Sequence, residues 1–111
     1  MRYIGKWTVV FVFSVLLTIS ISSSAQEKGQ ISPQEYYLEG VRHYNSGECS
    51  SARELLIQAI EKDPENDAAY YYLALSYIQL QDIQAGEAYL IKAQEKDPSN
   101  FWYRVKLAQL Y

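Results

Sequence analysis

The chain reads Ala59-Ile-Glu-Lys-Asp-Pro-Glu-Asn66 and, 34 residues later, Ala93-Gln-Glu-Lys-Asp-Pro-Ser-Asn100. Aligning residues 33–66 with 67–100 also matches Tyr36 with Tyr70, Tyr37 with Tyr71, Leu56 with Leu90, and Ile57 with Ile91. A fixed period in the range of about 20–50 residues is typical of stacked supersecondary units. The sequence therefore predicts repeated units in place of a single globular core.

Each unit has the pattern of two amphipathic helices joined by a turn. Tyr70, Leu73, Ala74 and Tyr77 are spaced i, i+3, i+4, i+7, which places them on one face of a helix. Gly86, Leu90 and Ala93 share a face of the following helix in the same way. Small residues such as Gly40, Ala52, Ala59, Ala74 and Ala93 allow two helix backbones to approach closely. We therefore expect each helix pair to pack through these faces and to stack on its neighbours.

With these positions the chain resembles the tetratricopeptide repeat (TPR) family, a helix-turn-helix repeat with eight packing positions. The second repeat supplies Tyr70, Leu73, Ala74, Tyr77, Gly86, Leu90, Ala93 and Pro98. The first supplies Tyr36, Gly40, Ala52, Leu56, Ala59 and Pro64, but has Glu39 and His43 where Leu and Tyr are usual. A third copy begins at Phe101, with Leu107, Ala108 and Tyr111 in place. The resemblance covers residues 33–111 and implies an all-α fold, a right-handed superhelix of antiparallel helix pairs.

Residues 1–25 have the features of a secretory signal peptide. Arg2 and Lys6 precede a mostly apolar run, residues 7–21, and Ser23 and Ala25 are the small residues of a cleavage site before Gln26. We expect a secreted or periplasmic protein, with a bacterial periplasm as the setting. The alternative is an uncleaved membrane anchor formed by residues 7–21, although that run is shorter than the ~20 residues needed to span a bilayer.

After a polar, flexible leader at 26–32, the pattern divides the chain into repeats 33–66 and 67–100 and the first helix of a third, 101–111. Ser32, Pro33 and Glu35 form a capping box at the first helix start. The expected helices are about 33–46, 51–62, 67–80, 82 or 83–96, and 101–111. Gly47 supplies a left-handed exit, and Pro64 and Pro98 end the second helix of each repeat.

Composition and motifs argue against several function classes. After residue 25 there are 8 Lys or Arg and 13 Asp or Glu, a net charge of −5, which disfavours nucleic acid and anionic membranes as partners. His43 is the only histidine, so it cannot build a metal site or a catalytic triad, and we expect a packing role. The chain has no phosphate-binding loop, HExxH motif or nucleophile elbow. We therefore expect no enzyme activity, no cofactor and no metal.

Cys49 is the only cysteine, so no intramolecular disulfide can form. It lies in the turn of the first repeat, aligned with Ile83 of the second. We expect a small buried apolar residue, and the alternative is an exposed thiol that forms an intermolecular disulfide in an oxidising compartment.

The TPR resemblance implies a concave groove lined by the first helix of each repeat. Carried over to this chain, its lining residues are Gln34, Tyr37, Val41, Tyr44 and Asn45, then Ala68, Tyr71, Leu75, Ile78 and Gln79, then Trp102, Val105 and Gln109. A cationic clamp for carboxylate tails, which some TPR proteins use, is not expected, because only Lys106 fits its pattern. The alternative for these residues is packing against neighbouring repeats or a further helix.

The leading functional hypothesis is a non-enzymatic interaction module that binds a peptide, a helix or a partner subunit in this groove. The rival hypothesis is a structural N-terminal segment of a longer TPR protein whose function lies downstream. The last helix is expected to leave Leu107, Leu110 and Tyr111 uncovered, which favours a longer array or self-association through that helix.

Overall fold

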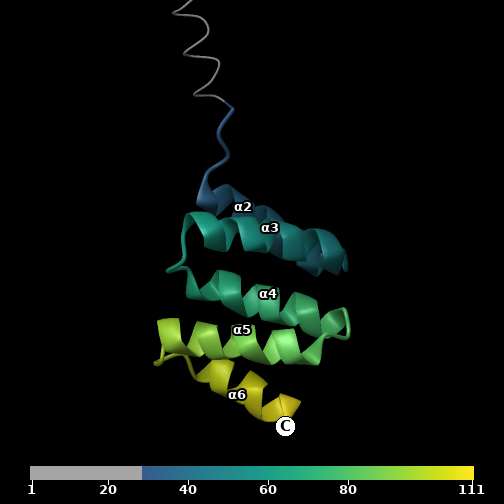
Figure 1. Cartoon of the computed structure of the whole chain (residues 1–111), viewed down its shortest axis with the longest axis vertical. Coiled ribbons are helices and arrows are strands. Elements are labelled where there is room, and N and C mark those ends of the chain that lie inside the picture. The colour runs from purple at the N-terminus through teal and green to yellow at the C-terminus, as the bar shows by residue number, and fades with distance from the viewer. Residues whose placement is uncertain (1–28) are drawn as a thin grey trace, which may run out of the picture. The chain divides into compact units, whose positions relative to one another are not determined.

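The computed structural model describes residues 29–111, and within them the chain forms five α-helices (Figure 1). The helices are α2 (Pro33–Asn45), α3 (Cys49–Lys62), α4 (Asp67–Gln79), α5 (Ile83–Lys96) and α6 (Phe101–Leu110). All five belong to one compact unit, Ser32–Tyr111. The predicted signal peptide, residues 1–25, and the first part of the leader lie outside the described residues.

Side-chain caps set most of the helix starts. Ser32 and Glu35 form the predicted capping box, in which the Glu35 amide donates to Ser32 Oγ at 3.2 Å. Asn66, Asp82 and Asn100 cap α4, α5 and α6 by accepting a backbone N–H. The start of the second helix was predicted about two residues too late, because α3 begins at Cys49 and its N-cap, Glu48, makes no side-chain cap bond.

The two turns within the repeats use the same backbone conformation with different residues. Gly47 has φ 83° and Gln81, which lies 34 positions later, has φ 69°. Glycine adopts this left-handed region without a steric penalty, whereas a residue with a side chain does not. The repeat geometry therefore imposes strain on Gln81 that the first repeat avoids.

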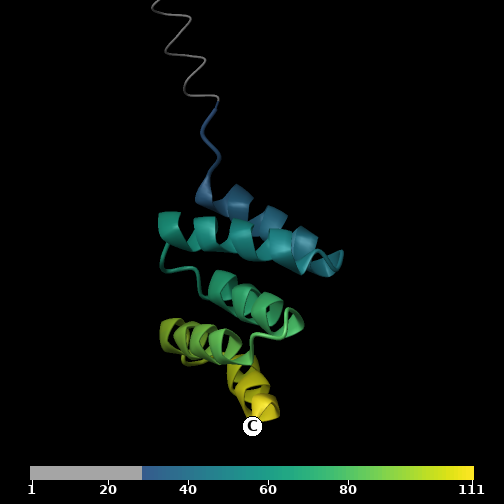
Figure 2. The same cartoon turned by 45° about the vertical axis from the view of Figure 1, so that its right-hand side comes forward.

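Consecutive helices pack against one another in sequence order (Figures 1 and 2). The closest pairs are α2 with α3 and α4 with α5, while α3 contacts α4 and α5 contacts α6 across the repeat boundaries. Gly40 shows how near the backbones come, since a Cβ built there would lie 2.7 Å from Leu56 Cγ. The small residues on the paired faces thus set the spacing of the helices, as predicted.

The core consists of three contiguous clusters between the helices. Ala52, Leu56, Ala69 and Leu73 join the first repeat to the second. The other two clusters contain Tyr70, Ala93 and Tyr103, and Ala74, Leu90 and Leu107, and both join the second repeat to α6. The expectation that Leu107 is uncovered was wrong, because it packs against Ala74 and Leu90 and is only 9% exposed.

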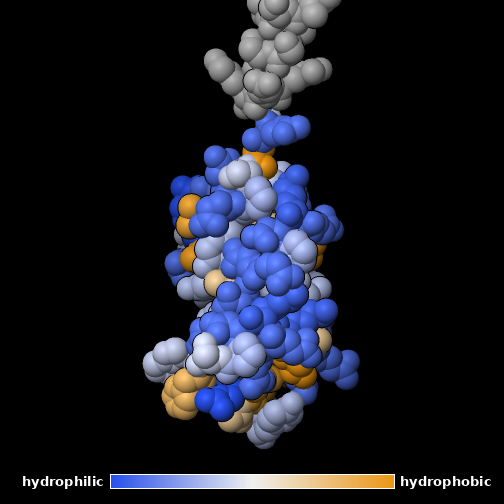
Figure 3. Space-filling model, turned by 90° about the vertical axis from the view of Figure 1, so that its left-hand side faces the viewer, coloured by the Kyte–Doolittle hydropathy of each residue, from blue (hydrophilic) through white to orange (hydrophobic). Residues whose placement is uncertain are grey.

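The outer surface is mainly polar. Figure 3 views the side that carries the turns between α3 and α4 and between α5 and α6, and hydrophobic side chains gather there toward the α6 end. Phe101 and Trp102, at the start of α6, are 59% and 68% exposed and lie edge to face with ring centroids 6.0 Å apart. The start of α6 therefore presents an exposed pair of large aromatic side chains.

Candidate functional site

Tyrosines from the first helix of each repeat form a continuous chain of ring contacts, which we call the tyrosine ladder. Its members are Tyr37 and Tyr44 of α2, Tyr71 and Tyr72 of α4, and Tyr103 of α6. The ring of Tyr72 lies 6.3 Å from Tyr37, 5.7 Å from Tyr44 and 5.5 Å from Tyr71. Tyr71 continues the ladder to Tyr103 at 5.1 Å. The ladder therefore crosses both repeat boundaries.

Neighbouring rings in the first part of the ladder stand steeply to one another. Tyr72 makes interplanar angles of 65° with Tyr37, 68° with Tyr44 and 74° with Tyr71. Edge-to-face pairs at these distances are favourable because the positive ring edge meets the negative ring face. The ladder therefore has alternating ring faces and edges around Tyr72.

The ladder hydroxyls differ in their hydrogen bonding. Tyr103 donates to Asp67 Oδ2 at 2.5 Å. Within residues 29–111, the hydroxyls of Tyr37, Tyr44, Tyr71 and Tyr72 have no protein partner. No side-chain nitrogen or oxygen in that range is buried without a partner, so these four hydroxyls reach solvent.

Burial raises the pKa of Tyr37, Tyr44, Tyr71 and Tyr103 in the ladder. For Tyr37, Tyr44 and Tyr71 burial is the main cause of the raised pKa, and the neighbouring Tyr72 adds to it. The pKa of Tyr103 is raised further by burial and by its hydrogen bond to Asp67. The unpartnered hydroxyls of Tyr37, Tyr44 and Tyr71 thus stay protonated at neutral and mildly alkaline pH, and they can donate hydrogen bonds.

The groove residues predicted from sequence differ widely in exposure. Tyr37, Val41, Tyr44, Tyr71, Ile78 and Val105 are half-buried, whereas Asn45, Gln79, Trp102 and Gln109 are exposed. Leu75 is only 8% exposed, and Ile78 packs into the cluster of Ala74, Leu90 and Leu107. Leu75 and Ile78 therefore contribute mainly to the packing of α4 against its neighbours. The accessible surface comes from the tyrosines, Trp102 and the three amides.

Two ladder members, Tyr72 and Tyr103, were not among the predicted groove residues. Tyr72 shares a helix face with Ala68, Leu75 and Gln79 at i, i+4, i+7 and i+11 spacing, so its periodicity could have found it. Tyr103 aligns with Ala69 and Glu35, so the repeat gives no corresponding signal.

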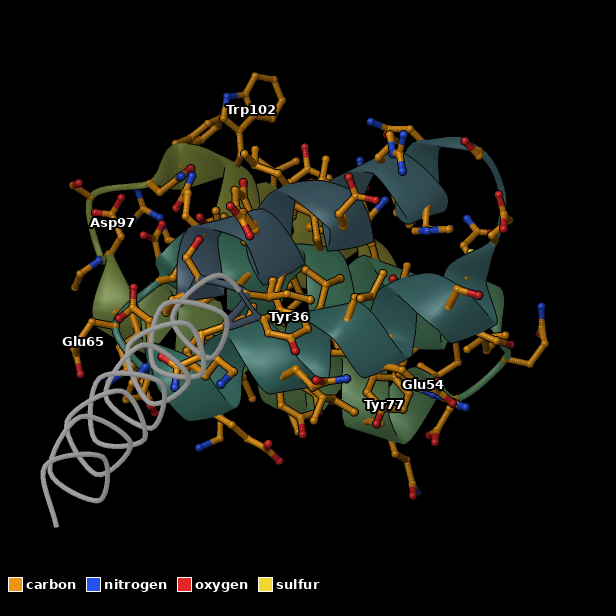
Figure 4. All side chains as sticks on the ribbon, turned by 90° about the horizontal axis from the view of Figure 1, so that it is seen from above. Tyr36, Glu54, Glu65, Tyr77, Asp97 and Trp102 are labelled. Carbon is orange, nitrogen blue, oxygen red and sulfur yellow. The ribbon has the colours of Figure 1, made fainter. Side chains whose placement is uncertain are left out.

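A second aromatic group lies on the other side of the repeats. Tyr77 and Tyr89 stack in parallel with ring centroids 5.5 Å apart, and Arg53 lies over Tyr77 at 5.9 Å. In Figure 4, Trp102 points away from the helices on one side, while Glu54 and Tyr77 lie on the opposite side. This second group joins α3, α4 and α5, and the cluster of Tyr70, Ala93 and Tyr103 connects it to the ladder.

A family model described as tetratricopeptide repeat matches residues 37–101. The chain belongs to the tetratricopeptide repeat family. A search of curated proteins gives no match. TPR repeats generally mediate protein–protein interactions and are typically non-enzymatic. The family thus agrees with the fold and indicates the general class of function.

The lone histidine and cysteine of this TPR chain lie at the end of the first helix pair. His43 Nδ1 is 3.2 Å from Glu48 Oε2, and Cys49 is half-buried at the start of α3. A pocket of about 360 Å³ beside them is lined by residues 47–51 together with Gln79 and Leu80. Its lining is mostly polar, with Leu80 as an apolar member, and it brings no second cysteine or histidine to Cys49.

Within residues 29–111, no group of three or more His, Cys, Asp or Glu is arranged to hold a metal ion. In the same part of the chain, no helix is long and apolar enough to cross a membrane.

Proposed function

We propose that this TPR chain is a non-enzymatic interaction module that binds a peptide, a helix or a partner subunit on the face carrying the tyrosine ladder. The main support is the row of half-buried rings from Tyr37, Tyr44, Tyr71 and Tyr72, whose hydroxyls reach solvent without a protein partner. Aromatic side chains with a polar tip are enriched at protein interfaces because they combine apolar area with a hydrogen-bonding group. Asn45, Gln79 and Gln109 of the predicted groove are exposed, so their amides can add polar contacts to a partner.

Site-specific photocrosslinking in the native host tests the proposal. A photoreactive amino acid at Trp102, which is 68% exposed, should crosslink to a defined protein, and Tyr71→Ala in the same chain should reduce the yield. The matched control carries the same group at Glu54, which is exposed on the opposite side (Figure 4). Equal yields from both positions, or a yield indifferent to Tyr71, would count against binding on this face.

We further propose that the chain is exported and cleaved after Ala25, giving a secreted or periplasmic protein that begins at Gln26. The support is the basic start, the apolar run 7–21 and the small residues before the cleavage point. Intact-mass measurement of protein isolated from its host provides the test. A membrane-bound species that retains Met1 would replace this proposal with an anchor formed by residues 7–21.

A second candidate function, a structural segment within a longer TPR array, is favoured by the outer face of α6. Ala108 is exposed, whereas Ala74, its equivalent in α4, is fully buried by α5. In an array, a further helix would cover Ala108 as α5 covers Ala74. A photoreactive group at Ala108 that crosslinks only to a second copy of this chain, or to a further repeat of the same polypeptide, would support this candidate.

A further inference from the structure

The chemistry of the tyrosine ladder narrows the class of partner, provided that the proposed interaction function is correct. Four ladder hydroxyls, those of Tyr37, Tyr44, Tyr71 and Tyr72, reach solvent with no partner in residues 29–111. Each can donate a hydrogen bond to a carbonyl oxygen of a bound chain. The ladder therefore suits a partner with many free acceptors along its backbone.

The charge on this face is small. Among the predicted groove residues and the ladder tyrosines none is Asp, Glu, Lys or Arg, and Lys106 of α6 is the residue equivalent to Tyr72. Asp67, at the start of α4, already accepts a hydrogen bond from the Tyr103 hydroxyl. A strongly acidic or basic segment would thus lose its hydration on this face without gaining matched counter-charges.

The ring geometry adds a shape requirement. The steep angles of 65–74° around Tyr72 leave steps between the faces of neighbouring ladder rings. Compact apolar rings fit such steps better than long aliphatic or charged side chains. Aromatic-lined surfaces of this kind recognise polyproline II helices, which are already extended and lose little entropy on binding.

We propose that the tyrosine ladder binds a proline-rich segment in the polyproline II conformation. Prolyl residues have no backbone N–H and leave every carbonyl free, so they match a surface that offers hydroxyl donors and carries no carboxylate among its lining residues. An amphipathic helix matches it less well, because a helix satisfies most of its carbonyls internally. A β-strand would need an open sheet edge, and residues 29–111 contain no strand.

Two adjacent tyrosines on α2 give a matched test. Tyr37 belongs to the ladder, whereas the ring of its neighbour Tyr36 lies beneath Lys62 of α3 at 5.6 Å. Both are half-buried, so replacing either by Leu removes a similar ring from the same helix. Only the Tyr37 replacement removes a ladder ring.

The experiment uses the mature chain from Gln26 and a fluorescent ten-residue oligoproline, with a Gly-Ser peptide of the same length and a helical Ala-Glu-Lys peptide as controls. We expect the oligoproline to bind at least about tenfold more tightly than either control. Tyr37→Leu should weaken it by about tenfold, as expected for loss of one buried ring and one hydrogen bond, while Tyr36→Leu changes it less than about twofold. Circular dichroism checks the fold of each variant.

A hydroxyl-only variant keeps the test decisive if Tyr37→Leu does not fold. The double variant Tyr37→Phe, Tyr44→Phe keeps both rings and should still weaken oligoproline binding several-fold. Oligoproline that binds no better than the Gly-Ser peptide would overturn the proline assignment, and so would binding that is indifferent to the ladder variants. Those results would contradict only the proline assignment if the Trp102 crosslink is still specific to this face. Absence of that crosslink would contradict the proposed interaction function itself.

Discussion

The Tyr103 hydroxyl of α6 donates a hydrogen bond to the Asp67 carboxylate at the first residue of α4, with 2.5 Å between the oxygens. The two residues are 36 positions apart, and the bond ties the start of one repeat to the start of the next. Tyr103 is only 4% exposed and packs against Tyr70 and Ala93. This polar contact thus lies at the edge of an apolar cluster and fixes the position of α6 on the second repeat.

Removing that hydroxyl should weaken the docking of α6. Tyr103→Phe keeps the ring but leaves Asp67 without this donor, and a hydrogen bond to a charged group contributes about 1.5 kcal/mol or more. We expect the free energy of unfolding to fall by about that amount in chemical denaturation. Tyr111→Phe is the control, because it removes a hydroxyl that bonds Glu87 at an exposed position, and it should leave the unfolding curve unchanged. Equal curves for all three proteins would show that the Tyr103–Asp67 bond contributes nothing.

Five tyrosines with raised pKa values predict a loss of stability in alkali. In the folded chain the pKa values of Tyr37, Tyr44, Tyr71, Tyr89 and Tyr103 are all raised from 10.0, so the unfolded chain releases these protons first. Stability from this source is complete below about pH 10 and falls as the pH rises above it. Melting temperatures measured from pH 8 to 11 should therefore decline only at the upper end of that range. Tyr103→Phe should make the decline in melting temperature shallower. A decline that begins below pH 9 would show that groups other than these tyrosines cause it.

The intra-repeat turns give a pair of substitutions with opposite signs. Gln81 has a positive φ of 69°, so Gln81→Gly should relieve backbone strain, partly offset by the greater freedom of glycine when unfolded. We expect a gain of up to about 1 kcal/mol. Gly47→Ala puts a Cβ on the equivalent residue, where nothing lies within 4 Å, so its expected cost of about 1 kcal/mol comes from the backbone alone. Denaturant midpoints that move in the same direction for both variants would contradict this account.

Repetition explains why the helices could be predicted from sequence. The 34-residue period, the Asn and Asp caps and the two Pro stops locate α4 and α5 to within about a residue, because these signals act locally. The start of α3 was missed because Glu48 makes no side-chain cap bond and leaves no signal of that kind. The burial of Leu107 and the role of Tyr103 depend on how α6 docks on the preceding repeat, which a local pattern does not contain. The groove assignment itself remains a prediction.

The close approach of α2 and α3 predicts that Gly40 tolerates no larger residue. The added methyl of Gly40→Ala would lie 2.7 Å from Leu56 Cγ and 2.8 Å from Leu56 Cδ2, and Leu56 is fully buried. Overpacking of this kind costs about 1–3 kcal/mol. In a double-mutant cycle, Leu56→Ala removes the clashing atoms, so Gly40→Ala should cost at least about 1 kcal/mol less in that background. Additive effects of the two substitutions would show that the cost of Gly40→Ala does not come from the contact with Leu56.

The outer face of α6 predicts self-association of the mature chain. Tyr111 is 84% exposed and Phe101 is 59% exposed, while Ala108 offers the small residue that lets another helix approach. Covering a large apolar side chain contributes about 1.5–3 kcal/mol, so two or three such contacts can support a weak dimer. Sedimentation equilibrium should show association that grows with protein concentration, and Ala108→Arg should shift the chain toward monomer. Ser50→Arg adds the same charge at an exposed position of α3 and should leave the association unchanged. A chain that stays monomeric at every concentration, or associates equally in both variants, would show that this face of α6 is stable in water and is not the contact surface.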